Sequence, residues 1–164
     1  MASLFVSRWD VAVVGKEPEW LRNQLGIAVA WQTHERYRYL LDSPRWQRIF
    51  NAGARAQRLL WASTGTKDPK ASDTLYVQAL AAPFTVNTMP EATLKALADH
   101  GEIDGSMPVR SCKGDEVLAK FAKAGIHIEA LGEQLQVEGA ASFVKSWNDL
   151  LECIAVKSKT LMAA

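Results

Sequence analysis

The chain has 164 residues, 48% of them hydrophobic and 23% charged, which is typical of one globular domain with a sizeable core. Its net charge is +1 and its basic residues are spread along the chain, which disfavours electrostatic binding of nucleic acid. No apolar run approaches the roughly 18 residues that cross a membrane, and no leader pattern surrounds the first apolar stretch. We therefore expect neither a membrane nor a nucleic-acid partner.

The first strand is predicted within residues 1–8, where a short apolar run ends in Arg8 and a turn follows near Pro18. This pattern indicates a buried strand with polar residues at its exit. In parallel α/β sheets, ligands bind just beyond the carboxyl ends of the strands. Ser3, Ser7 and Arg8 are therefore the first site candidates, and the alternative is an ordinary strand with a surface arginine.

A long amphipathic helix is predicted over residues 20–41, because its apolar positions recur at intervals of three and four. Residues 42–44 end this helix and start a shorter one, which Gly53 terminates. Three tryptophans at helical spacing are interpreted as core side chains, with a stacking platform for bases or sugars as the alternative: Trp20, Trp31 and Trp46.

A second strand is predicted over residues 58–62, followed by a hydroxyl-rich exit loop that ends in Lys67. The loop lacks the Walker pattern, because Lys67 precedes Asp68 and not a serine or threonine. Hydroxyl groups and a lysine at the end of a buried strand suit an anionic substrate group. A solvated loop lysine is the alternative.

The remaining chain again alternates between predicted helices and strands, which favours an α/β fold. The predicted elements are a helix after residues 72–74, a strand at 84–87, a helix from 90 to 98, a turn-rich segment at 101–114, and helices at 115–125, 128–137 and 143–154.

Neither the histidines nor the cysteines form a pattern that predicts a metal site or a nucleophile. His34 is placed on the polar side of its helix, His100 at a helix end where a cation is favourable, and His127 alone. Cys112 and Cys153 have no partner at metal spacing, which indicates reduced thiols in a cytoplasmic protein, with a disulfide as the less favoured alternative. No cofactor is expected.

Several stretches of the chain carry motifs of one known enzyme family. Residues 2–10, Ala-Ser-Leu-Phe-Val-Ser-Arg-Trp-Asp, are similar to the sixth barrel strand of transaldolases, where a Ser-x-Phe-Val-x-Arg pattern lines the sugar-phosphate site. Residues 58–67 resemble the seventh strand, and residues 73–77 and 85–94 resemble the eighth strand and its helix. The similarity keeps this order over nearly the whole chain, and it resembles the carboxyl-terminal portion of the branch that also occurs fused to phosphoglucose isomerase.

The resemblance implies a fold and a set of site residues. The expected fold is a partial (β/α)8 TIM barrel of the class I aldolase type, with three parallel strands and many helices. A whole barrel takes about 250 residues, so this chain can supply only part of one. We expect a single domain over residues 1–164, with strand-helix units in 1–100 and terminal helices in 101–164. The implied substrate-binding residues are Ser3, Phe5, Arg8, Ser63 and Lys67.

The resemblance also implies an activity, namely transfer of a dihydroxyacetone unit between sugar phosphates in the pentose phosphate pathway. In that family a Schiff-base lysine on strand four works with an aspartate on strand one and a glutamate on strand three, and all three precede the matched region. We therefore expect no catalytic residue here and no activity in isolation. The expected partners are a sugar phosphate in a completed barrel, and either a complementary amino-terminal segment or a second copy. A non-catalytic binding or assembly domain is the alternative.

Overall fold

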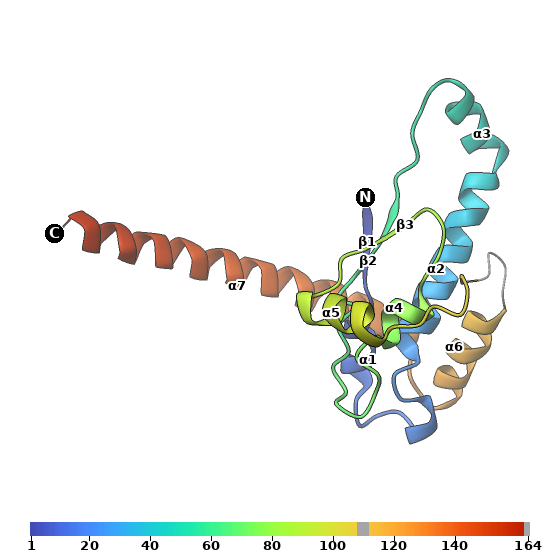
Figure 1. Cartoon of the computed structure of the whole chain (residues 1–164), viewed down its shortest axis with the longest axis horizontal. Helices are drawn as coiled ribbons and strands as arrows, with labels where there is room; N and C mark the ends of the chain where they lie inside the picture. Colours follow the sequence, from blue (N-terminus) through green and yellow to red (C-terminus); the bar gives the residue numbers. More distant parts are fainter. Residues whose placement is uncertain (108–111, 163–164) are drawn as a thin grey trace. The chain divides into compact units, whose positions relative to one another are not determined.

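The computed structural model describes residues 1–107 and 112–162 (Figure 1). The chain divides into two compact units, Met1–His127 and Ile128–Ala164, and each is described by itself. Part of the predicted turn-rich segment, residues 108–111, lies outside the described residues. No helix in the described part of the chain is both long and apolar enough to cross a membrane.

Three parallel strands form the sheet of the first unit, β1 (Ala2–Phe5), β2 (Leu59–Ala62) and β3 (Thr85–Asn87), in the order β1-β2-β3. This confirms the predicted α/β class, in the arrangement of part of a (β/α)8 barrel. All four residues of β2 are buried, whereas β1 and β3 are edge strands with intermediate or exposed residues. The central strand is therefore the only one of the three with a partner on each side.

The open edge of β1 has a defined direction. The N–H of Ala2 donates to the carbonyl oxygen of Arg58 at 2.9 Å, so it points toward β2. Successive residues of a strand alternate, and the N–H of Ser3 therefore points away from β2, toward the open edge. That edge is a template for another strand.

Six α-helices and one 3-10 turn complete the described part of the first unit. They are α1 (Val6–Val13), η1 (Glu19–Leu21), α2 (Leu25–Asp42), α3 (Pro44–Asn51), α4 (Leu75–Ala79), α5 (Glu91–His100) and α6 (Lys113–Lys123). The stop at residues 42–44 is confirmed, because the Ser43 side chain caps α3 by accepting from the N–H of Trp46, and Pro44 occupies the first helical position.

Three boundary predictions are wrong. The first strand ends at Phe5, and the chain enters α1 at Val6, so Ser7 and Arg8 lie in a helix and β1 is not buried. The helix predicted over residues 20–41 is broken, because Asn23 has a φ of +62° and separates η1 from α2. The two final helices are one, α7 (Ile128–Met162), which makes up the described part of the second unit.

The core of the first unit forms where β2, α1, α2 and α4 meet. Its buried members are Val6, Ala30, Leu59, Trp61, Tyr76, Leu80 and Met107. The prediction that Trp20, Trp31 and Trp46 are core side chains is wrong in part: Trp20 is 61% exposed, and the other two are half-buried. Trp61, on the central strand, is the fully buried tryptophan.

Helix α2 packs against α1 and α6 through two glycines. A Cβ on Gly26 would lie 2.5 Å from the Val6 carbonyl oxygen, and one on Gly114 would lie 3.0 Å from the Ala28 carbonyl oxygen. His34 faces this interior at 1% exposure, so its predicted place on the polar side is wrong. Burial, and next the charge of Arg38, lowers the pKa of His34 and keeps the ring neutral.

Candidate functional site

The carboxyl ends of β1 and β2 meet through two serines. Ser7 lies in the first turn of α1 and is 1% exposed, and its N–H donates to the carbonyl oxygen of Ser63 at 3.0 Å. Their hydroxyl oxygens are hydrogen bonded at 2.7 Å. Ser63 has a φ of +55°, a left-handed conformation that is uncommon for a residue with a side chain. The chain thus adopts a strained turn to bring together two hydroxyls that are 56 positions apart.

The ends of β2 and β3 are joined in the same way. Thr64 is fully buried, and its hydroxyl donates to the Asn87 side-chain oxygen at 2.7 Å. The N–H of Thr88 donates to the Trp61 carbonyl oxygen at 3.0 Å. Side-chain hydrogen bonds therefore tie all three strand ends together, and they fix the row of hydroxyls along the carboxyl edge of the sheet.

The predicted residues Phe5 and Arg8 lie at this edge and touch each other. The Arg8 guanidinium lies 4.8 Å from the centre of the Phe5 ring, which holds the cation beside the strand end. Ser3 does not reach this point. It is in register with Leu60, three residues before Ser63, a separation of about 10 Å along the strand. Ser7, and not Ser3, is the serine that contacts Ser63.

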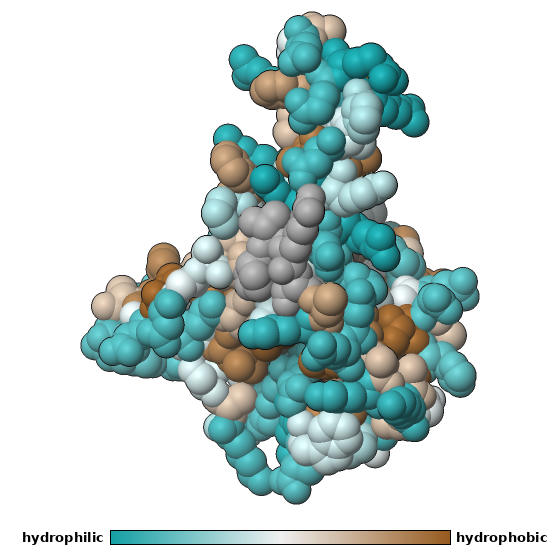
Figure 2. Space-filling model, turned by 90° about the vertical axis from the view of Figure 1, so that its right-hand side faces the viewer, coloured by the Kyte–Doolittle hydropathy of each residue, from teal (hydrophilic) through white to brown (hydrophobic). Residues whose placement is uncertain are grey.

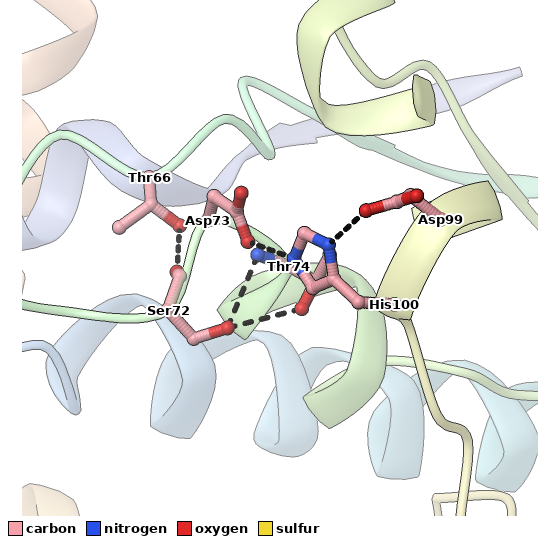
Figure 3. A network of polar contacts seen from close by, with 6 residues as sticks. All are labelled: Thr66, Ser72, Asp73, Thr74, Asp99 and His100. Atoms are coloured by element: carbon pink, nitrogen blue, oxygen red, sulfur yellow. Dashed lines mark hydrogen bonds and ion pairs between the residues drawn. The ribbon is translucent and has the colours of Figure 1, made fainter. Parts of the chain in front are cut away.

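Lys67 lies in a different place from the other predicted site residues. It lines a cavity of about 270 Å³ together with Asp10, Arg22, Asp68 and Tyr76, and the described lining includes none of Ser3, Phe5, Arg8 and Ser63. The exit loop that carries Lys67 is held by its own contacts (Figure 3): the Thr66 hydroxyl donates to the Ser72 carbonyl oxygen, and the Ser72 and Thr74 hydroxyls are hydrogen bonded.

The same loop is fastened to α5 by a histidine between two carboxylates (Figure 3). His100 Nε2 lies 3.0 Å from Asp73, and Nδ1 lies 3.2 Å from Asp99. The contact with Asp73, and then that with Asp99, raises the pKa of His100. Only the imidazolium can donate from both nitrogens, so the geometry favours the charged form. Sequence reasoning missed this contact, because Asp73 lies 27 positions away.

Asp10 is the buried charge of the cavity. Its carboxylate accepts from the N–H groups of Leu25 (2.9 Å) and Gly26 (3.1 Å) and from the Tyr76 hydroxyl (2.9 Å). Burial raises the pKa of Asp10 to about 6, against these three donors. Burial and the charge of Asp10 also raise the pKa of Tyr76. Because its three donors lie in α2 and α4, Asp10 anchors α1 to the amino terminus of α2.

The cavity is also lined by one further carboxylate and two cations, Asp68, Arg22 and Lys67. The Asn23 amide donates to Asp68 at 2.9 Å, and this hydrogen bond is the largest of the effects that lower the pKa of Asp68. Arg22 lies 3.8 Å from the same carboxylate. Lys67 adds a second cation that has no carboxylate partner within 4.0 Å among the described residues. No group of side chains in the described part of the chain has the composition of a metal site.

These features define the class of protein: an α/β sheet of barrel type whose strand ends carry hydroxyls and a guanidinium. The sequence model of the Transaldolase/Fructose-6-phosphate aldolase family matches residues 1–154, and the chain belongs to this family. The predicted family is thereby confirmed.

Named relatives agree with this assignment. The chain is 46% identical over 162 residues to the transaldolase of Parafrankia sp. (strain EAN1pec), 44% over 164 residues to that of Frankia alni, and 42% over 172 residues to that of Thermobifida fusca. Each match covers 94% of this chain but 44% of the relative. The chain therefore spans less than half the length of these curated relatives.

Proposed function

We propose that this chain supplies part of the phosphate-binding side of a transaldolase, which transfers a dihydroxyacetone unit between sugar phosphates in the pentose phosphate pathway. The observation that carries the proposal is the hydrogen-bonded pair Ser7 and Ser63, where the carboxyl ends of β1 and β2 meet. The buried Ser7 holds the half-buried Ser63 in place, and with Arg8 nearby this strand end offers a hydroxyl and a guanidinium, which are groups that match phosphate oxygens.

The proposal includes a need for a complementary segment. A Schiff-base lysine needs a pKa lowered by desolvation or by nearby cations. All ten lysines of this chain are exposed, so none has the buried setting that desolvation requires. Within residues 1–107 and 112–162, no further strand covers the outer edges of β1 and β3. We therefore propose that the chain corresponds to the carboxyl-terminal part of the enzyme, in the branch that also occurs fused to phosphoglucose isomerase, and that it is inactive in isolation.

We also propose that the protein is located in the cytoplasm. Cys112 and Cys153 are both free and exposed, as expected for thiols kept reduced in the cytoplasm.

Reconstitution tests this function. The chain is coexpressed with the part of the Parafrankia relative that lies outside the matched region, and transfer from fructose 6-phosphate is assayed. We expect activity from the pair and none from either part. Arg8→Ala should raise the Michaelis constant about tenfold or more by removing charge-assisted hydrogen bonds, whereas Arg36→Ala, an exposed arginine on α2, should leave it unchanged.

Borohydride trapping provides a second readout that does not depend on reconstitution. With fructose 6-phosphate present, the isolated chain should stay unlabelled, because each of its lysines is solvated. Stoichiometric labelling of one lysine would contradict the proposed absence of the catalyst. A copurifying pair without activity would instead favour a non-catalytic assembly domain.

A further inference from the structure

A second pocket lies at the opposite end of the sheet, beside the amino ends of the strands. Its cavity volume is about 550 Å³, within the range of small-molecule sites. Two of its lining residues, Arg58 and Phe84, immediately precede β2 and β3, and the others come from α2, α3 and the segment after α3. It therefore shares no residue with the serine pair at the carboxyl ends.

Three guanidinium groups line this pocket: Arg38, Arg55 and Arg58. None of them has a carboxylate within 4.0 Å in the described residues, although Asp42 also lines the pocket. The Nε of Arg38 is buried and has no hydrogen-bond partner there. A buried N–H donor without an acceptor is costly, so this donor needs an acceptor that the chain itself does not provide.

The charge around this pocket is concentrated in one segment. Residues 35–58 hold six of the nine arginines of the chain and two acidic residues, a net charge of +4, while the whole chain carries +1. The interpretation that basic residues are spread along the chain is therefore wrong for the arginines. Figure 2 shows the end of the unit formed by α2 and α3, at the top, as mainly hydrophilic with apolar side chains between.

Aromatic rings form the apolar part of the lining. Trp46 and Phe50 lie with their ring centres 6.4 Å apart, and Phe84 has the Arg38 guanidinium 5.6 Å from its centre. Phe50 is 54% exposed and Phe84 is 69% exposed, so large apolar surface faces the open pocket. Aromatic faces stack on planar rings, and guanidinium groups bind phosphate oxygens in pairs.

We propose that this pocket binds a nucleoside phosphate, with the phosphate on the arginines and the base against the aromatic rings. An inorganic phosphate would leave the rings exposed, and a neutral nucleoside would leave the three cations unpaired. A long nucleic-acid strand is less suited, because the cations are gathered in one pocket and the chain as a whole is nearly neutral. This site is independent of the proposed transaldolase function.

Calorimetric titration of the full chain with ADP tests the proposal. ADP should bind, and adenosine, inorganic phosphate and fructose 6-phosphate should each bind at least about tenfold more weakly, since each lacks one of the two recognised groups. Raising the salt from about 50 mM to about 200 mM should weaken ADP binding. Stronger binding of a short single-stranded oligonucleotide than of ADP would overturn the proposal and indicate a site for single-stranded nucleic acid.

Two exposed arginines provide variants that leave the fold intact. Arg55→Gln and Arg58→Gln should each weaken ADP binding about three- to tenfold. Arg36→Gln and Arg48→Gln remove the same charge from α2 and α3 without touching the pocket lining and should have no comparable effect. Equal losses in all four variants would show nonspecific attraction, and unchanged affinity in Arg55→Gln and Arg58→Gln would place ADP elsewhere; either result overturns the site.

Discussion

Replacing Gly26 by alanine tests how the first turn of α1, which carries Ser7 and Arg8, is held in place. A Cβ at this position would lie 2.5 Å from the Val6 carbonyl oxygen and 2.6 Å from the Asp10 Oδ2. The first obstacle is backbone, so it cannot rotate out of the way. Helix α2 has to move away from α1 if a methyl group is added.

The cost follows from these contacts. Overpacking against fixed backbone costs about 1–3 kcal/mol. Moving α2 away from α1 would also break the hydrogen bonds from Leu25 and Gly26 to Asp10, which are worth about 1 kcal/mol each. Alanine recovers about 1 kcal/mol of helix propensity. We expect a net loss of about 2–4 kcal/mol in the free energy of unfolding.

Urea unfolding followed by circular dichroism measures this loss. Gly114→Ala is the graded control, because its added Cβ would lie 3.0 Å from the Ala28 carbonyl oxygen, a contact that a small shift relieves. Its cost should be smaller than that of Gly26→Ala. If Gly26→Ala were as stable as the wild-type chain, the close approach of α2 to α1 would not exist in solution, and the position of the serine pair would need another explanation.

Three further predictions concern charge and edges. Because burial raises the pKa of Asp10 from 3.8 to about 6, the folded state binds more protons than the unfolded state between these values. Stability should therefore fall by about 2 kcal/mol as pH rises from about 4 to about 6, and Asp10→Asn should flatten that slope in urea titrations. His100 has a raised pKa, so its contact with Asp73 and Asp99 should be complete below about pH 6.5 and lost as pH rises through the folded-state pKa. Amide protection factors in α5, which are corrected for the intrinsic pH dependence of exchange, should report the loss, and His100→Gln should make them independent of this titration. Ser3→Pro removes the donor on the open edge and should shift the chain from a dimer or larger assembly toward a monomer in sedimentation, whereas Ser3→Ala should not.

Local sequence chemistry was sufficient to predict most of the elements. The run at residues 58–62 is short, apolar and bounded by polar residues, and it became β2, the buried central strand. Ser43 and Pro44 are a cap and a first-turn residue, and they began α3 as expected. Such signals act within a few residues, so they do not depend on the rest of the fold.

The first eight residues show where local signals fail. Val6 continues the apolar run of β1, yet it is fully buried at the start of α1. The hydrogen bond from Ser7 to Ser63 ends the strand there, and this contact depends on a residue 56 positions away. A lysine in place of Val6 would therefore disrupt the core, so such a variant is no test of the open edge of β1.

The site was predictable only in part for the same reason. The resemblance pointed to the carboxyl ends of β1 and β2, where the structure places Phe5, Arg8 and Ser63, but the register of β1 with β2 decides that Ser7, and not Ser3, meets Ser63. Asp10 gave no distinct signal, since its donors in α2 and α4 are known only once the helices are packed. The sequence shows six arginines within residues 35–58. It does not show that three of them line one pocket, because this depends on how the chain turns between α2 and α3.

The open edges also bear on which partner could complete the proposed enzyme. A closed barrel of this type has eight strands, and the described part of this chain provides three, with both outer edges unpaired. A second copy raises the number only to six, whereas a segment with five strands can pair with β1 and with β3 and close the ring. Self-association would cover the edges but leave the serine pair without the opposite wall of the barrel. If the proposed function is correct, the complementary segment should therefore displace the second copy when the two compete.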